Sequence, residues 1–162
     1  MPLNAGMFSS VSPEWETPRA LFDQLDKRYG PFTLDVCATH ANAKCKRYFT
    51  EREDGLIQAW SKMNWMNPPY GRTIGEWIRK ASEEARQGNR TVALLPARTD
   101  TKWFHGYIYG RHPVHFLCGR VKFGGSKNSA PFPSMVVLFG PEWCRTVAAN
   151  QPEQPPLTSV GR

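Results

Sequence analysis

Residues 62–88 read "KMNWMNPPYGRTIGEWIRKASEEARQG" and set a short apolar run, two consecutive prolines and an amphipathic segment in direct succession. The first six residues predict a strand that ends at the prolines. In residues 74–87 the apolar side chains recur at helical spacing, and Gly88 suits the position that follows a helix. The stretch therefore predicts a strand, a rigid turn and a helix, with Asn67 at the end of the strand.

The alternation of strands and helices continues on both sides of this unit. Upstream, residues 15–30 predict a helix that Thr17 caps, with Pro18 in its first position and Gly30 at its end. Strands are also predicted at 32–38, 91–96, 114–123 and 134–140, and a helix capped by Asp100 at 100–110. This order predicts an α/β fold with a mostly parallel sheet, covered on both faces, that ends in a C-terminal antiparallel hairpin.

Composition bounds the kind of protein. With 162 residues the chain is long enough for one domain, which we expect at 13–148, between loosely ordered polar segments at 1–12 and 149–162. No apolar run has the length of a membrane span, and no secretion signal pattern is present, so a cytoplasmic protein without membrane contact is expected. The net charge of +7 favours polyanionic partners such as nucleic acid. The four cysteines are scattered without metal-ligand spacing, which predicts reduced thiols and no metal.

The polar groups from Asn67 to Tyr70 suit one chemical problem. The exocyclic amine of adenine is a poor nucleophile because its lone pair is delocalised into the ring. The side-chain oxygen of Asn67 and the carbonyl of Pro68 could accept its two hydrogens and stabilise the positive charge that develops on attack. Proline fixes this carbonyl because its φ is locked. Tyr70 could stack on a base that has been swung out of a duplex, a contact worth about 1–3 kcal/mol per base.

Six blocks in order carry a resemblance to a known family: "WETPRALF", "FTLDVCA", "NWMNPPYG", "VALLPARTDTKWFH", "GRVKFGG" and "SAPFPSMVVLFG". Together they resemble the phage-type DNA N6-adenine methyltransferases. The resemblance implies a reduced Rossmann-like methyltransferase fold, S-adenosylmethionine as cofactor and DNA as partner, in a bacterial or phage-infected cell. It implies a catalytic loop formed by Asn67, Pro68, Pro69 and Tyr70. It implies cofactor contacts from Trp15, Thr17, Pro18, Asp35, Cys37 and Asp54.

Substrate contacts are predicted from two further segments. Arg98, with Asp100 and Lys102, follows a predicted strand and could touch the substrate. The loop "KFGGSKNSAPFP" is basic and glycine-rich, which suits a segment that grips a phosphate backbone or a flipped base. Its candidates are Lys122, Lys127 and Phe132.

Other functions stay open on the residues alone. The motif at 67–70 is also that of enzymes that methylate cytosine N4 or protein glutamine. A DNA-binding module that has kept the fold and lost the cofactor is a third possibility, because "LDVCATHANAK" has no glycine-rich turn after its strand. Taken singly, Thr17-Pro18 is a common helix start, Asp35 a common residue at the end of a strand, and Asp54-Gly55 a common turn pair.

Overall fold

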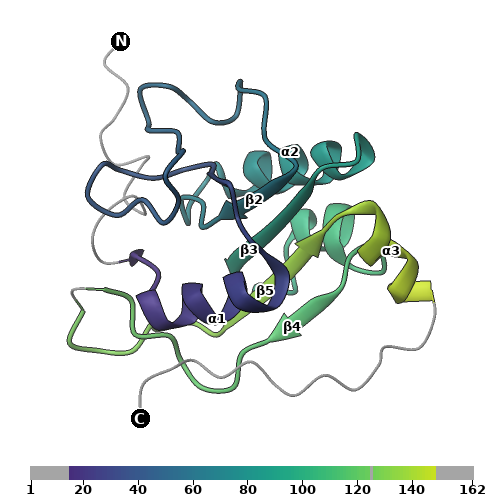
Figure 1. The fold of residues 1–162 in the computed structure, drawn as a ribbon. Helices are drawn as coiled ribbons and strands as arrows, with labels where there is room; N and C mark the ends of the chain where they lie inside the picture. Colours follow the sequence, from purple (N-terminus) through teal and green to yellow (C-terminus); the bar gives the residue numbers. More distant parts are fainter. Residues whose placement is uncertain (1–14, 125, 149–162) are drawn as a thin grey trace.

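The computed structural model describes residues 15–124 and 126–148, which form one five-stranded sheet of order β1-β2-β3-β5-β4 (Figure 1). Its strands are β1 (Leu34–Asp35), β2 (Met63–Met66), β3 (Arg90–Pro96), β4 (Val114–Phe116) and β5 (Ser134–Phe139). Strands β1, β2 and β3 pair in parallel, whereas β5 is antiparallel to both β3 and β4. The predicted α/β class and the antiparallel C-terminal hairpin are therefore confirmed.

Helical segments pack on both faces of the sheet (Figure 1). They are α1 (Arg19–Tyr29), α2 (Ile74–Arg86), the π-helix η3 (Phe104–Ile108) and α3 (Pro141–Ala148). Successive side chains of a strand point to opposite faces, so Trp65 packs in the same cluster as α1, and Met66 in the cluster of α2 and η3. Two apolar cores result, and each holds one layer of helices against the sheet.

Several sequence predictions need correction. Thr17 does not cap α1: Pro18 occupies the cap position without a side-chain bond, and the Thr17 hydroxyl instead accepts a hydrogen bond from Asn67. Asp100 does not cap its helix, because the Thr101 hydroxyl accepts the backbone N–H of Phe104. Helix α3 was not predicted.

The strand predicted at 32–38 has only two residues, and the chain that returns along 47–49 also hydrogen-bonds to Asp35. The Asp35 N–H donates to the Arg47 carbonyl, and the Phe49 N–H donates to the Asp35 carbonyl. In the described chain no further strand lies between β1 and β2, which leaves the sheet reduced on this side.

Sheet direction brings the predicted site residues to one edge. Strands β1, β2 and β3 end at this edge, which places Asp35, Asn67 and Arg98 on or just beyond their carboxyl ends. Strand β4 runs in the same direction as β3, because both are antiparallel to β5. The loop at 117–133 therefore starts at the same edge. No helix among the described residues is both long and apolar enough for a membrane span.

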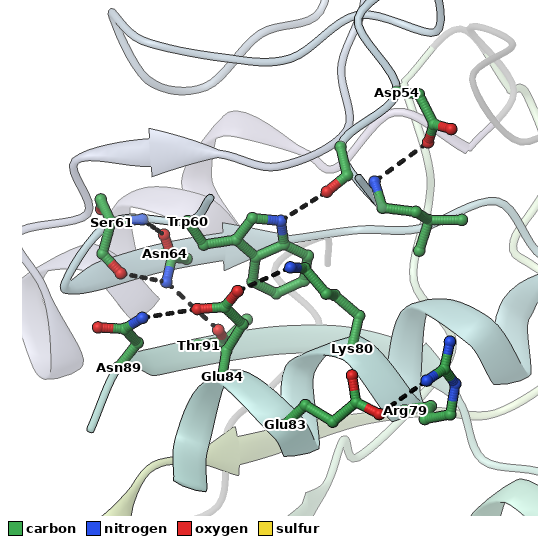
Figure 2. Close-up of polar contacts among 12 residues, drawn as sticks. Asp54, Trp60, Ser61, Asn64, Arg79, Lys80, Glu83, Glu84, Asn89 and Thr91 are labelled. Carbon is green, nitrogen blue, oxygen red and sulfur yellow. Dashed lines mark hydrogen bonds and ion pairs between the residues drawn. The ribbon is translucent and has the colours of Figure 1, made fainter. Parts of the chain in front are cut away.

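A buried polar network fastens the chain before β2 to α2 (Figure 2). The carboxylate of Glu84, 4 % exposed, forms an ion pair with Lys80 at 2.8 Å and accepts a hydrogen bond from the Asn89 amide at 2.6 Å. The Lys80 ammonium also lies 5.7 Å from the ring centroid of Trp60. The indole N–H of Trp60 donates to the Gly55 carbonyl at 2.7 Å, which ties the 54–60 loop to this helix.

This network allows a matched test on one helix. Glu84→Ala leaves the Lys80 ammonium and the Asn89 amide without their partner in a buried setting, so we expect the free energy of unfolding to fall by about 3 kcal/mol. Its neighbour Glu83 forms an equivalent pair with Arg79 at 2.7 Å, but on the surface. Glu83→Ala should therefore cost less than about 0.5 kcal/mol. Urea unfolding of both variants measures the difference, and equal losses would refute a structural role for the network.

Candidate active site

The side chain of Asn67 is held in one orientation. Its amide nitrogen donates to the backbone carbonyl of Trp15 at 2.8 Å and to the Thr17 hydroxyl at 3.0 Å. A carbonyl oxygen can only accept, so the nitrogen rather than the oxygen of the amide must face Trp15. Both amide hydrogens are thereby used, and the orientation of Oδ1 follows from them.

The Oδ1 atom of Asn67 is buried and has no hydrogen-bond partner among the described residues. Burial of an acceptor without a donor costs about 1–3 kcal/mol, so such an atom calls for a reason. An acceptor that is fixed in place and unused is suited to an N–H group of a ligand. The Pro68 carbonyl is likewise an acceptor suited to an N–H group of a ligand, because no described residue donates a hydrogen bond to it.

The two prolines and Cys37 hold the turn against the sheet. Pro68 and Pro69 are buried, and neither has a backbone N–H that would need a partner. The Cys37 thiol donates to the Asn67 carbonyl at 3.0 Å, which links the residues that follow β1 and β2. Burial raises the pKa of this thiol well above its usual range, so it stays protonated and remains a donor.

Aromatic rings surround the other end of the turn. The Tyr70 ring lies 6.2 Å from that of Trp15, 5.5 Å from Phe132 and 6.1 Å from Phe123. The Tyr70 hydroxyl donates to the Leu94 carbonyl of β3 at 3.1 Å, so the ring is held at both ends. Burial raises the pKa of this phenol well above its usual range, and it acts as a neutral aromatic group.

Two pockets meet at Trp15. The first, the β1 pocket, is lined by Trp15, Glu16, Thr17, Asp35, Cys37, Asn42, Lys44, Trp65 and Asn67. The second, the loop pocket, has a volume of about 110 Å³ and is lined by Trp15, Phe123, Ser126, Asn128, Ser129, Ala130 and Pro131. Trp15 is the residue common to both linings, so the two pockets lie next to each other at this residue.

Asp35 is the buried acid of the β1 pocket. It is 3 % exposed, and its carboxylate accepts the backbone N–H groups of Lys44 at 3.0 Å and Cys37 at 3.4 Å. Burial raises its pKa to about 7, although the two N–H groups and the Lys44 charge oppose the shift. Through these two hydrogen bonds the carboxylate holds the backbone of the loop at 37–44 in place. The sequence has no glycine-rich turn after β1 that could shape the loop instead. A cation placed beside Asp35 would restore the ionised form.

An ion pair spans the β1 pocket. The Lys44 ammonium, whose side chain is 8 % exposed, lies 2.9 Å from the Glu16 carboxylate. The pocket has a volume of about 20 Å³, room for little more than one water molecule. A ligand of nucleoside size therefore requires that residues 15–16 and the loop at 37–44 move apart.

The remaining predicted residues fall into two groups. Phe132 joins the aromatic cluster, with its ring 5.1 Å from that of Trp15. Pro18 lies beside the site at the start of α1. Asp54 adopts a φ of +53° in a turn, where its carboxylate accepts the Leu56 N–H, and it does not line the β1 pocket. Arg98, Lys122 and Lys127 are exposed near the same edge of the sheet and line neither pocket.

The pocket linings include residues that were not predicted, among them Glu16, Asn42, Lys44 and Phe123. Glu16 and Lys44 are 28 residues apart, and each alone reads as an ordinary surface charge. Phe123, 2 % exposed, reads as a core residue of a strand. Charge pattern and apolar periodicity describe local structure, so they do not predict contacts between residues this far apart in the sequence.

The orientation of Asn67 can be tested without a ligand. Thr17→Val keeps the shape of the side chain but removes the hydroxyl that accepts from the Asn67 amide. We expect the free energy of unfolding to fall by about 1 kcal/mol and one Asn67 amide proton to exchange faster with water, as read by NMR. Thr17→Ser keeps an acceptor and should restore slow exchange. Unchanged exchange in Thr17→Val would show that this contact does not hold the amide.

Similarity to known proteins extends over most of the chain. The profile of the family described as DNA N-6-adenine-methyltransferase (Dam) matches residues 6–150. A DNA N-6-adenine-methyltransferase of Escherichia phage T1 is 36 % identical over 97 residues, which cover 59 % of this chain and 40 % of that relative. Another, of Haemophilus phage HP1, is 29 % identical over 136 residues, which cover 79 % of each chain. The predicted family is thereby confirmed: the chain belongs to the DNA N-6-adenine-methyltransferase (Dam) family.

Proposed function

We propose that this protein transfers a methyl group from S-adenosylmethionine to the N6 amine of adenine in DNA. The observation that carries the proposal is the Asn67 Oδ1 atom, which is buried, fixed in direction and without a partner. The names of the phage relatives, which match 59 % and 79 % of this chain, favour the same reaction.

The proposed role of the turn is to make the amine nucleophilic. When Asn67 Oδ1 and the Pro68 carbonyl each accept one N–H of the amine, its lone pair is drawn out of conjugation with the ring. The two oxygens also stabilise the positive charge that develops on nitrogen during attack. A carboxamide is too weakly basic to remove a proton beforehand, so the proton leaves after transfer, to water. Tyr70 stacks on the base and excludes solvent from one of its faces.

The residues of the β1 pocket fit the cofactor in chemical type. Bound S-adenosylmethionine supplies a methyl group that its sulfonium centre activates for transfer. Its ammonium group suits the buried Asp35, whose carboxylate lacks a cationic partner at hydrogen-bond distance in the described chain. Trp15, Thr17 and Cys37 line the same pocket, and we propose that they contact the cofactor together with Pro18. Asp54 stays a candidate from resemblance alone.

The β1 pocket has to widen to admit the cofactor. We propose that the ion pair between Lys44 and Glu16 breaks when it does.

We further propose that the sheet is a reduced Rossmann-like sheet. Three parallel strands bear the cofactor residue Asp35 and the catalytic residue Asn67 at their carboxyl ends, where such sheets bind ligands. The domain spans 13–148 in this proposal, and the predicted flexible segments 1–12 and 149–162 lie outside the described residues.

DNA is the proposed partner, in the cytoplasm of a bacterial or phage-infected cell. Exposed cations at the edge of the sheet that carries Asn67 support this choice: Arg98, Lys122 and Lys127. We propose that a flipped base enters beside the loop pocket and Phe132, and that Lys122 and Lys127 contact the DNA backbone near it.

Substitution of the turn tests the reaction. Asn67→Ala should lower kcat by about 10²–10³, because it removes one of two acceptors on the developing charge. Tyr70→Ala should weaken the productive complex by about 1–3 kcal/mol, and Tyr70→Phe, which keeps the ring, by less. Gln87→Ala, at an exposed position just after α2 that lines neither pocket, is the control.

The readout for these variants is transfer of labelled methyl to duplex DNA, with digestion to nucleosides. Label on cytosine, or on protein supplied in place of DNA, would replace adenine N6 with one of the other acceptors. No transfer at all, combined with no heat of binding for the cofactor, would favour a DNA-binding module without catalysis.

Cofactor binding should depend on pH through Asp35. Its pKa of about 7 means that the free protein carries the proton in acidic solution, whereas the ammonium of the cofactor requires the carboxylate. The affinity for S-adenosylhomocysteine should therefore rise with pH, up to about tenfold per unit below the pKa, and level off above it. Calorimetry in buffers of different ionisation enthalpy reports both affinity and proton release. Asp35→Asn should abolish both effects, and an affinity independent of pH in the wild type would contradict this role.

A further inference from the structure

A third cavity lies at the opposite edge of the sheet from Asn67. It has a volume of about 310 Å³ and is lined by Ser82, Ala85, Arg86, Arg111, His112, Pro141 and Cys144. These residues come from the C-terminal part of α2, the chain before β4 and the start of α3. Strand β5 runs against β3, so α3 starts where β3 begins, and an ion pair of 2.9 Å between Arg90 and Glu142 links the two. The cavity, called here the arginine cavity, takes no part in the methyl transfer proposed above.

Two guanidinium groups at this cavity have no acidic partner among the described residues. They belong to Arg86 and Arg111. Three carboxylates on α2 and α3 are already engaged: Glu83 with Arg79, Glu84 with Lys80 and Glu142 with Arg90 (Figure 2 shows the first two pairs). The helices therefore leave two cations at the cavity with their charge uncompensated.

The charges of the two arginines act on the side chain of His112. The imidazole is 6 % exposed, and burial together with the charges of Arg111 and Arg86 lowers its pKa to about 4. Its Nδ1 atom lies 3.2 Å from the Cys144 sulfur. Burial raises the pKa of that thiol, so the thiol and the imidazole form a neutral pair that offers the arginines no anion. Arg86 and Arg111 are both exposed, so their guanidinium groups are open to an anion from solution.

We propose that the arginine cavity binds the phosphate group of a small phosphomonoester. A dianionic phosphate matches two guanidinium groups, each of which can donate two parallel hydrogen bonds. The apolar walls from Ala85 and Pro141 suit the carbon body that carries the phosphate. A cavity of this size lies at the lower end of the range typical of small-molecule sites.

The test uses phenyl phosphate, a phosphomonoester with an apolar body, and follows alkylation of Cys144 by iodoacetamide with peptide mass analysis. Bound phosphate should slow the alkylation of Cys144 and raise the pKa of His112, which NMR measures separately. Cys118, which is exposed and lies outside the cavity, is the internal control and should react at an unchanged rate. Sodium chloride at the same ionic strength controls for screening.

Variants separate a built site from general attraction to a basic protein. Arg86→Ala and Arg111→Ala should each raise the phenyl phosphate concentration that gives half-maximal protection of Cys144 by at least about tenfold. Each substitution removes a charged hydrogen-bonding partner of the phosphate. Arg79→Ala removes the same charge from the same helix outside the cavity and should leave the protection unchanged. Circular dichroism verifies that each variant is folded.

Three outcomes would overturn the proposal. Protection that Arg79→Ala reduces as much as Arg86→Ala would mean that only net charge matters. No protection of Cys144 and no shift of His112 at the highest soluble phenyl phosphate would mean that the cavity binds no phosphate. Protection by a DNA duplex but not by phenyl phosphate would make the cavity a contact for the nucleic-acid backbone instead.

Discussion

The site depends on the two hydrogen bonds that fix the Asn67 amide. The donors are the two amide hydrogens, and the acceptors are the Trp15 carbonyl and the Thr17 hydroxyl, both contributed by the chain just before α1. Because the amide nitrogen is committed there, its oxygen becomes a buried acceptor aimed by the fold. Helix α1 packs on one face of β2 and α2 on the other, and this packing holds the end of β2 in place.

The same segment links the two pockets. The backbone of Trp15 accepts a hydrogen bond from the Asn67 amide, its ring contacts Tyr70, Phe123 and Phe132, and the residue lines both the β1 pocket and the loop pocket. The next residue, Glu16, pairs with Lys44 across the β1 pocket. A movement of residues 15–17 that admits a cofactor would thus also shift the acceptors that hold Asn67. Under the proposed function, cofactor binding and the orientation of Asn67 would therefore be coupled through three consecutive residues.

Local chemistry made part of this site predictable from sequence. An apolar run, two prolines and a helical period identify a strand, a turn and a helix without reference to distant residues, and Asn67 and Tyr70 lie where that pattern places them. The roles that were missed depend on contacts across long separations. Thr17 reads as a helix cap, but its hydroxyl is used by a residue 50 positions away. The parallel bridge between Asp35 and Tyr48 likewise joins residues whose sequence pattern does not predict the contact.

The central claim is that Asn67 Oδ1 accepts a hydrogen bond from the adenine amine, and a thermodynamic cycle measures this contact directly. Duplexes with adenine or with purine, which lacks the amine, are bound to wild type and to Asn67→Ala in the presence of S-adenosylhomocysteine. We expect loss of the amine to cost wild type about 1–2 kcal/mol more binding free energy than it costs the variant. Equal costs in the two proteins would show that the amine and Asn67 do not interact, and would contradict the account.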